Sequence, residues 1–179
     1  MEQNAFQDIS NLEIGQELGI LNQDLIRQMN ELLNDRSLFS VVKALTGVEK
    51  IGCFTGRFIK MLPGFSLDWH TDFFGNCLIG LSLNLGRASF KGGDFQIRFK
   101  GKDRDKDGDK DEDKEEILFE RKNTRAGDAH IFLLGEDLEH RLKEVEGGSA
   151  RYTFAGWFRS APDFTHADYG PLLTECLED

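Results

Sequence analysis

A histidine and an aspartate stand two residues apart in the stretch DWHTD, residues 68–72. Alternate side chains of a β-strand point to the same face, so His70 and Asp72 would present a nitrogen and an oxygen to one point in space. Such a pair can bind a divalent metal. An HxD pattern also arises by chance, and a polar pair at the end of a strand is the alternative interpretation when the pair is taken alone.

A second histidine and an arginine further along the chain strengthen the metal interpretation. His140 lies in GEDLEHRLKEV, which opens another expected strand, and Arg151 follows eleven residues later, beyond a Gly-Gly turn. Two imidazoles and one carboxylate form a facial ligand set for ferrous iron that leaves coordination positions open. We therefore expect His70, Asp72 and His140 to bind one divalent metal.

The strand expected to begin near Arg151 has one face that is unusually polar for a core. Alternation divides its side chains into two sets. One face carries Arg151, Thr153, Ala155 and Trp157, and the other carries Tyr152, Phe154, Gly156 and Phe158. A guanidinium, a hydroxyl and an aromatic ring on one face suit a pocket for a small carboxylate, which a guanidinium binds through two parallel hydrogen bonds. A solvent-exposed arginine is the alternative.

Most of these residues must be positioned by strands, which are expected throughout the chain after residue 50. The segments there are short, β-branched or aromatic, and separated by Gly, Asn and Asp. The expected strands span residues 51–61, 66–72, 77–85, 94–99, 116–121, 129–134, 139–145 and 150–159. Eight short strands predict a mainly β fold, an antiparallel sandwich or barrel. Its core should be aromatic, because the chain contains 15 Phe.

Residues 21–46 have helical periodicity instead. Their apolar side chains recur at helical spacing, namely Leu21, Leu25, Ile26, Met29, Leu32 and Leu33. This pattern predicts one or two amphipathic helices with a break near Asn34–Asp35, and Gly47 can end the second. A chain of 179 residues fits a single domain, in which residues 161–179 would form an irregular tail.

The order of these motifs resembles a known enzyme family. An HxD pair, a distal His and a following Arg, on a run of short strands, are similar to the Fe(II)/2-oxoglutarate-dependent oxygenases, above all to their prolyl-hydroxylase-like group. The resemblance covers residues 51–160 and includes CLIGLSLNL, GGDFQIRF and GDAHIF. It implies a double-stranded β-helix, a jelly-roll core with the N-terminal helices packed on it, and Fe(II) and 2-oxoglutarate as cofactor and cosubstrate.

The resemblance also implies which residues bind the metal and the cosubstrate. His70, Asp72 and His140 match the iron ligands. Arg151 matches the residue that pairs with the distal carboxylate of 2-oxoglutarate, and Thr153 matches the hydroxyl position two residues later.

Two further positions complete this comparison. Trp157 matches an aromatic residue that lines the site beside the iron in some members of the family. Many members have a Tyr shortly before the HxD histidine that helps to hold the cosubstrate. Lys60 or Met61 occupies that region here, so the cosubstrate pocket departs from the family pattern, and we expect Lys60 to contribute to it.

The implied reaction is hydroxylation of a peptidyl-proline, an amino acid or a small metabolite, with release of succinate and carbon dioxide. Because Asp72 is present, no ligand position is vacant for a halide, which favours hydroxylation over halogenation. Because the Tyr is missing, a non-catalytic function is an alternative. In that case the chain would be a jelly-roll protein that binds the metal, 2-oxoglutarate or another protein without turnover. A zinc hydrolase is a further alternative, but it leaves Arg151 and Thr153 without a task.

Composition and charge exclude several other functions. The net charge of −10 opposes binding to nucleic acid. No apolar run reaches membrane-spanning length, and no signal peptide is visible. Cys53, Cys77 and Cys176 are widely spaced, without a CxxC pair, so we expect thiols in a reducing compartment. These features predict a cytoplasmic protein with no membrane partner.

The segment at residues 101–116, GKDRDKDGDKDEDKEE, contains only Gly and charged residues. It cannot bury a face, so it should be a charged loop inserted in the β core. Its DRDKDG stretch, residues 103–108, resembles the first half of a calcium loop. Lys110 and Lys114 occupy positions where such a loop has an apolar residue and its closing Glu. We therefore expect a solvated loop at residues 103–114, with calcium as the alternative.

Three aromatic residues are expected to have no part in the site. His130 lies in an apolar strand and should pack there. His166, in the tail, has no identifiable partner. Trp69 alternates away from His70 and should lie in the core.

Overall fold

The structure is a computed structural model that describes residues 6–8, 17–20, 23–86, 90–100, 116–122 and 125–161. The expectations for the charged loop and its calcium alternative, for His166 and for Cys176 therefore fall outside the described residues. So does the tail beyond residue 161.

Two helices follow one another near the N-terminus, α1 (Gln23–Leu33) and α2 (Arg36–Thr46). Asp35 separates them as an N-cap: its backbone is extended, and its side chain accepts a hydrogen bond of 2.8 Å from the Ser37 N–H. Gly47 ends α2 in the left-handed conformation at φ 73°, where its N–H donates to the Lys43 carbonyl. The predicted break and the predicted helix end are both confirmed.

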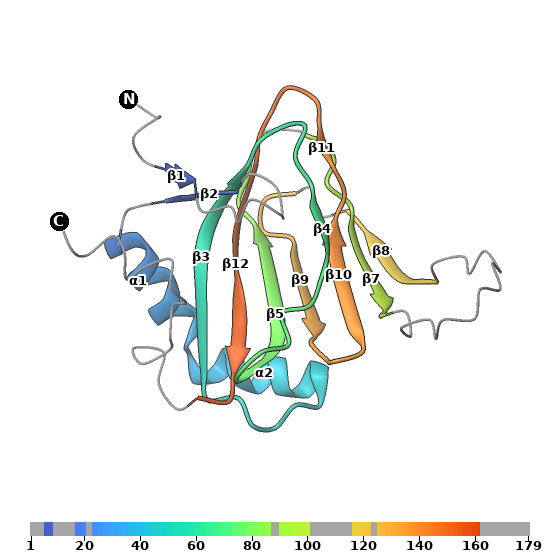
Figure 1. Ribbon diagram of the computed structural model, residues 1–179. Helices are drawn as coiled ribbons and strands as arrows, with labels where there is room; N and C mark the ends of the chain where they lie inside the picture. The colour runs from blue at the N-terminus through green and yellow to red at the C-terminus, as the bar shows by residue number, and fades with distance from the viewer. Residues whose placement is uncertain are drawn as a thin grey trace, which may run out of the picture.

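The described strands form three antiparallel sheets (Figure 1). The largest contains, in spatial order, β1 (Phe6–Asp8), β2 (Glu17–Ile20), β3 (Cys53–Met61), β12 (Arg151–Arg159), β5 (Cys77–Asn84) and β9 (Ala129–Leu133). The second contains β4 (Leu67–His70), β10 (Leu138–Leu142), β7 (Phe95–Phe99) and β8 (Ile117–Arg121). The third is the short pair β11 (Val145–Glu146) and β6 (Lys91–Gly92).

This architecture confirms the predicted mainly β jelly-roll with helices packed on it. The expected strand at 66–72 is shorter, because β4 ends at His70. The expected strand at 139–145 is divided into β10 and β11, which pair with different strands. β1 and β2 were not predicted; they extend the largest sheet beyond β3.

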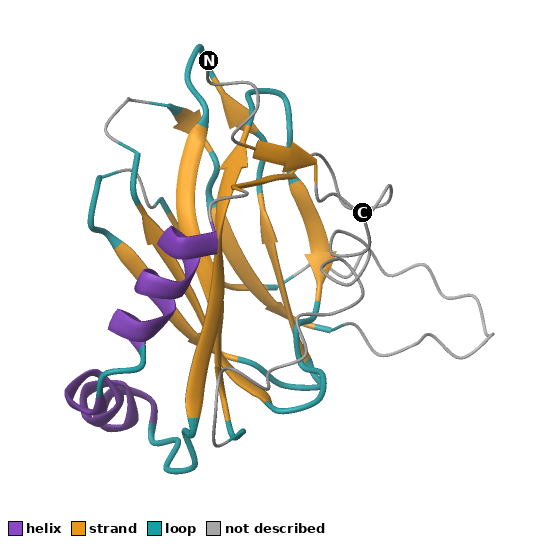
Figure 2. Ribbon diagram, turned by 90° about the vertical axis from the view of Figure 1, so that its left-hand side faces the viewer, coloured by secondary structure: helices purple, strands orange, loops and turns teal. Residues whose placement is uncertain are grey.

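The helices cover the outer face of the largest sheet (Figure 2). The cluster beneath them is aromatic, as expected. It is centred on Phe54, Phe154 and Phe158, each 0% exposed, and includes Val42 of α2. The Phe54 and Phe158 ring centroids lie 4.9 Å apart. Burial of these rings anchors the helices to β3 and β12.

Asn30 of α1 and Asn34, the residue that follows this helix, also satisfy the backbone of β3. The Asn30 side chain accepts from the Gly56 N–H at 2.8 Å and donates to the Gly56 carbonyl at 3.2 Å. Asn34, one turn later, makes the same pair of bonds with Phe54, both at 2.8 Å. Among the described residues, β2 pairs with β3 at residues 59–61. At Phe54 and Gly56 the two amides make the hydrogen bonds that a neighbouring strand would otherwise make.

A second apolar cluster lies on the inner side of the strands. Its buried members are Met61, Phe90, Phe95, Leu142 and Val145. The β12 side chains that share this interior belong to the polar face, with Arg151 5% and Thr153 1% exposed. The two faces of β12 are therefore divided as the alternation predicts.

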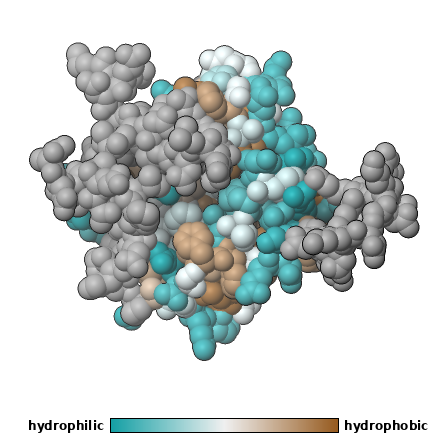
Figure 3. Space-filling view, in the orientation of Figure 1, coloured by the Kyte–Doolittle hydropathy of each residue, from teal (hydrophilic) through white to brown (hydrophobic). Residues whose placement is uncertain are grey.

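Polar residues cover most of the described surface visible in Figure 3, and an apolar patch lies low on this face. Within the described residues, no helix has the length and apolar character needed to cross a bilayer. Cys53 and Cys77 are buried thiols, and burial raises the pKa of Cys77 to about 11.

Candidate metal centre

Two histidines face each other across neighbouring strands. His70 is the last residue of β4 and lies directly opposite His140 of β10 in the antiparallel register. Directly opposed residues of an antiparallel pair project their side chains to the same face. The two imidazole centroids are accordingly 4.2 Å apart, and His140 is only 7% exposed.

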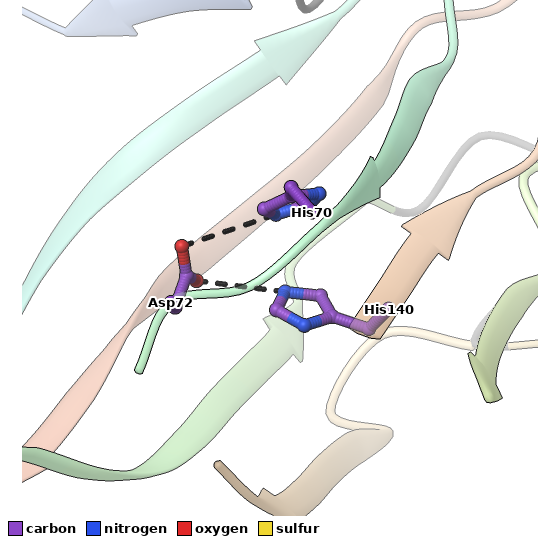
Figure 4. Close-up of side chains that lie close together, drawn as sticks. All are labelled: His70, Asp72 and His140. Atoms are coloured by element: carbon purple, nitrogen blue, oxygen red, sulfur yellow. Dashed lines mark ion pairs between the residues drawn. The ribbon is translucent and has the colours of Figure 1, made fainter. Parts of the chain in front are cut away.

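Asp72 lies beside the two rings, with one carboxylate oxygen facing each of them (Figure 4). Its Oδ1 is 3.9 Å from His70 Nε2, and its Oδ2 is 3.5 Å from His140 Nε2. Each of the three residues offers a ligand atom, and these atoms all lie within 4.8 Å of one another. The three predicted ligands therefore converge from positions up to seventy residues apart in the sequence.

A backbone contact orients the His70 ring. Its Nδ1 lies 2.7 Å from the carbonyl oxygen of Asp68. A carbonyl oxygen can only accept, so Nδ1 carries the proton and Nε2 presents its lone pair toward Asp72 and His140. Holding one ring nitrogen in this way fixes the tautomer that a metal ligand requires.

Trp157 of β12 holds the carboxylate. Its Nε1 donates a hydrogen bond of 2.8 Å to Asp72 Oδ2. Asp72 follows the end of β4, so strand alternation alone does not fix its position. The indole links the carboxylate to the large sheet, while the two histidines belong to the smaller one.

The same neighbours keep the carboxylate ionised. Burial of Asp72 by itself raises the pKa of its carboxyl. When the two imidazoles are protonated in the metal-free site, the hydrogen bond and charge of His140, the charge of His70 and the Trp157 N–H together outweigh burial, and the pKa is lowered. Two imidazoles and one ionised carboxylate fit the donor set that ferrous iron accepts on one face of its coordination sphere.

Arg151 and Thr153 lie on the same inner face of β12 as Trp157. The Arg151 Nη2 donates to Ser82 Oγ of β5 at 3.1 Å in a buried contact. Thr153 lies opposite Asn84 of β5 in the register. The structure thus places the guanidinium inside the jelly-roll, and the solvent-exposed alternative for Arg151 is wrong.

On β3, the strand that pairs with β12, the side chains of Lys60 and Met61 point to opposite faces. Met61 is opposite Arg151 in the register and is 2% exposed within the inner cluster. Lys60 is opposite Tyr152, and its Nζ lies 5.7 Å from the centre of that ring. Consecutive strand residues point to opposite faces. The expectation of a cosubstrate contact at Lys60 is therefore not supported by its position, and Met61 is the residue brought to the interior.

His130 and Trp69 lie apart from the ligand cluster. His130 packs against Phe95, with ring centroids 5.2 Å apart, as expected. Trp69 does alternate away from His70, but its expected core position is wrong. Its ring lies on the outer face of the smaller sheet between the guanidiniums of Arg98 and Arg141, whose Cζ atoms are 4.2 and 4.4 Å from its centre.

Two exposed aromatics follow the ligands in the loop after β4. Phe73 and Phe74 are 40% and 53% exposed. The Phe74 ring makes an edge contact with Trp157 at 5.9 Å. This loop therefore places apolar surface directly beside the Asp72 carboxylate.

Sequence reasoning missed three residues that lie at or beside the site. Asp68 acts through its backbone carbonyl, which no side-chain pattern can indicate. Ser82 and Asn84 lie in CLIGLSLN, where two polar residues alternate within an apolar strand. That alternation was a usable signal, because it marks a polar inner face on β5.

Comparisons with known proteins agree with this geometry. The family model described as the 2OG-Fe(II) oxygenase superfamily matches residues 56–159. Among solved structures, a Pseudomonas putida prolyl-4-hydroxylase is similar, with a TM-score of 0.59 and 15% identity over 87% of this chain and 77% of that one. A Burkholderia pseudomallei oxidoreductase of the 2OG-Fe(II) oxygenase family gives 0.56 and 16%, over 88% of this chain and 64% of that one. No curated protein matches the chain.

Proposed function

The chain belongs to the 2OG-Fe(II) oxygenase superfamily, and we propose that it hydroxylates a small-molecule or peptide substrate, using Fe(II) and 2-oxoglutarate. The observation that carries the proposal is the direct opposition of His70 and His140 across β4 and β10, with the Asp72 carboxylate close to both rings. A facial set of two imidazoles and a carboxylate leaves positions for a chelating cosubstrate.

In this proposal His70, Asp72 and His140 hold the iron. Asp68 and Trp157 keep the His70 ring and the Asp72 carboxylate in the orientation that binding requires. Bound iron would supply the activation of oxygen, coupled to conversion of 2-oxoglutarate to succinate and carbon dioxide. Because Asp72 supplies the carboxylate ligand, no coordination position is left vacant for a halide, which supports hydroxylation over halogenation.

Arg151 would bind the distal carboxylate of 2-oxoglutarate. Arg151 is 5% exposed, and its guanidinium donates to Ser82 Oγ. A buried guanidinium can form two parallel hydrogen bonds with a carboxylate, and Thr153 offers a hydroxyl on the same face. The Met61 side chain would form an apolar wall in the position where we expected Lys60.

The substrate would enter beside Phe73, Phe74 and Trp157. An exposed apolar patch next to partly buried polar ligands is typical of a binding site. A peptidyl-proline, an amino acid and a small metabolite all contain C–H groups that such a surface could hold near the metal.

Succinate release tests this proposal. The Fe(II)-loaded protein is incubated with 2-oxoglutarate, oxygen and a panel of peptides, amino acids and small metabolites, and succinate is measured. We expect a substrate to raise succinate formation in the parent and in Gln28→Ala, a change on the exposed side of α1, but not in His140→Ala.

Two outcomes would favour the alternatives. Binding of 2-oxoglutarate without succinate from any substrate would favour a non-catalytic binding protein. Hydrolysis supported by Zn(II), with no binding of 2-oxoglutarate, would favour a hydrolase and remove the role given to Arg151.

A further inference from the structure

The inner face of β5 presents two polar side chains beside the Arg151 guanidinium. Ser82 and Asn84 are two residues apart and therefore share a face. In the register of β5 and β12, Ala155 lies opposite Ser82 and Thr153 lies opposite Asn84. Asn84 is 0% exposed, so this amide is fully enclosed.

The path of the Arg151 side chain passes Asn84. Arg151 precedes Thr153, the partner of Asn84, by two residues, yet its Nη2 reaches Ser82 at 3.1 Å. The side chain must therefore extend along β5 past Asn84 to arrive at Ser82. The amide and the guanidinium are neighbours on one inner face.

The amide has a defined orientation and an unused donor. Its Oδ1 accepts a hydrogen bond of 3.2 Å from the Gly86 N–H, which fixes which end is oxygen. Within the described residues, its buried Nδ2 has no hydrogen-bond partner. Leaving a buried donor unsatisfied is destabilising, so such groups in a native protein call for an explanation, and a missing ligand is one.

The neighbouring contacts indicate which kind of ligand would satisfy this donor. An amide N–H pair and a guanidinium are both donors, so they attract the same group: an anion with several acceptor oxygens, such as a carboxylate. Met61, which lies opposite Arg151 on the other side of β12, cannot donate a hydrogen bond. Thr153 offers one hydroxyl from β12, and Asn84, opposite it on β5, can supply a further donor.

We propose that Asn84 donates through Nδ2 to the distal carboxylate of 2-oxoglutarate, beside Arg151. The inference rests on the proposed function, since it assigns a residue to the cosubstrate pocket of the same site. A bound structural water is the competing partner for Nδ2. If water is the partner, a substitution of Asn84 would alter stability but would not lower the affinity for one ligand more than for another.

Asn84→Asp is the most direct variant. It keeps the shape of the side chain and the oxygen that accepts from Gly86, but it replaces the donor with an oxygen that repels a carboxylate. Asn76→Asp is the matched control, because Asn76 is exposed and also accepts a hydrogen bond, from Ser160 Oγ at 3.3 Å. The chain thus offers the same chemical change inside and outside the proposed pocket.

The measurement is ligand affinity by calorimetry on Mn(II)-loaded protein, in which no turnover occurs. Two ligands are compared: 2-oxoglutarate, and 2-oxopentanoate, which has a methyl group where 2-oxoglutarate has its distal carboxylate. We expect Asn84→Asp to weaken 2-oxoglutarate about tenfold or more, because a hydrogen bond to a charged group is replaced by repulsion. The affinities for Mn(II) and for 2-oxopentanoate should stay within about twofold, and Asn76→Asp should match the parent throughout.

Failure of the Asn84 donor and failure of the proposed function give different results in these measurements. Equal 2-oxoglutarate affinity in Asn84→Asp and the parent would overturn the donor, as would an equal loss for both ligands. A parent that binds Mn(II) but not 2-oxoglutarate would overturn the proposed function, and the donor with it. If the aspartate variant does not fold, Asn84→Ser decides: a loss confined to 2-oxoglutarate supports the donor, and an unchanged affinity rejects it.

Discussion

At the scale of single residues, the ligand cluster depends on contacts that orient groups already close together. Asp72 lies beyond the end of β4, and its direct tie to the larger sheet is the Trp157 N–H. The two tryptophans of the chain make a natural comparison, because the Trp69 Nε1 is buried but has no hydrogen-bond partner among the described residues.

Trp157→Phe should weaken metal binding, because it removes the N–H that holds Asp72 while keeping an aromatic, smaller ring at this position. Loss of such an outer contact reduces metal affinity by about tenfold to a hundredfold. Titration of the metal-free protein with Fe(II) under anaerobic conditions measures it. Trp69→Phe, the matched control, should bind as the parent does, and a Trp157→Phe variant with parental affinity would refute the role of the indole.

Arg151→Ala should lose affinity for 2-oxoglutarate while binding iron nearly as the parent does. Removing one partner of a desolvated charge pair costs about 2–5 kcal/mol, or about thirtyfold or more in dissociation constant. Arg151→Lys should lose less, because it keeps the charge without the two-pronged geometry. Titration of the anaerobic Fe(II) protein with 2-oxoglutarate checks this, and equal affinity in all three proteins would exclude Arg151 from the pocket.

His130 should make the fold sensitive to mild acid. Burial lowers the pKa of His130 below its ordinary value of 6.5, and the charges of Arg151 and Arg121 lower it further, against the opposing Asp128 carboxylate and a hydrogen bond to the Lys122 backbone. The unfolded chain then takes up this proton at a higher pH than the folded chain. The contribution of neutral His130 to stability is present above pH 6.5 and is lost as the pH falls toward the folded pKa.

His130→Gln should reduce this part of the acid sensitivity. The free energy of unfolding of metal-free parent and variant, measured by urea titration from pH 8 downward, provides the comparison. The difference between the two proteins should be constant above pH 7 and should shift in favour of the variant below about 6.5. Parallel curves throughout would show that the buried ring is not the source.

At the scale of elements, α1 does two things for β3. It packs on the outer aromatic cluster, and the amides of Asn30 and of Asn34, which follows the helix, hydrogen bond to Gly56 and Phe54 at the edge of β3. β3 in turn pairs with β12 along its whole length, and β12 carries Arg151, Thr153 and Trp157. The helix thereby supports the strand that positions the site.

Asn30→Ala should destabilise the protein by about 2–3 kcal/mol, because it leaves a buried N–H and a buried carbonyl of Gly56 unsatisfied. Gln28→Ala, on the exposed side of the same helix, should change stability by less than about 0.5 kcal/mol. Urea unfolding of the three proteins measures the difference. An Asn30→Ala variant as stable as Gln28→Ala would show that water satisfies this edge equally well.

At the scale of the whole molecule, the charged loop is inserted between two strands that are already neighbours. β7 pairs with β8, with Arg98 opposite Ile117, so the ends of the connection lie side by side. β7 and β8 pair directly with each other, and the loop between them contains no apolar residue that could contribute to the core.

Deletion of residues 103–114 should therefore leave the fold intact. Lys100, Gly101, Lys102, Glu115 and Glu116 would remain as a five-residue connection, a length common in hairpins, and shortening a loop changes its closure entropy little. Thermal melts in calcium-free buffer should agree within a few degrees. A large loss of melting temperature would contradict this expectation, and stabilisation of the parent alone by calcium would favour a metal loop.

The sequence by itself determined what depends on local periodicity and on residue type. A period of two placed Arg151, Thr153 and Trp157 on one face, and helical spacing with Asp35 and Gly47 set the two helices. The order of HxD, His and Arg indicated the family. These features are readable because backbone geometry alone fixes which side chains of one element share a face.

Only the tertiary structure decided what depends on which strands are neighbours and in what register. It set His70 opposite His140, brought Trp157 to Asp72, put Met61 and not Lys60 beside Arg151, and placed Trp69 between two arginines outside the core. It also showed that Asn30 and Asn34 hydrogen bond to the backbone at the edge of β3. A shift of one residue in pairing would turn each of these side chains to the other face. Register is selected by the burial of the whole sheet, so it cannot be read from the pattern of a single strand.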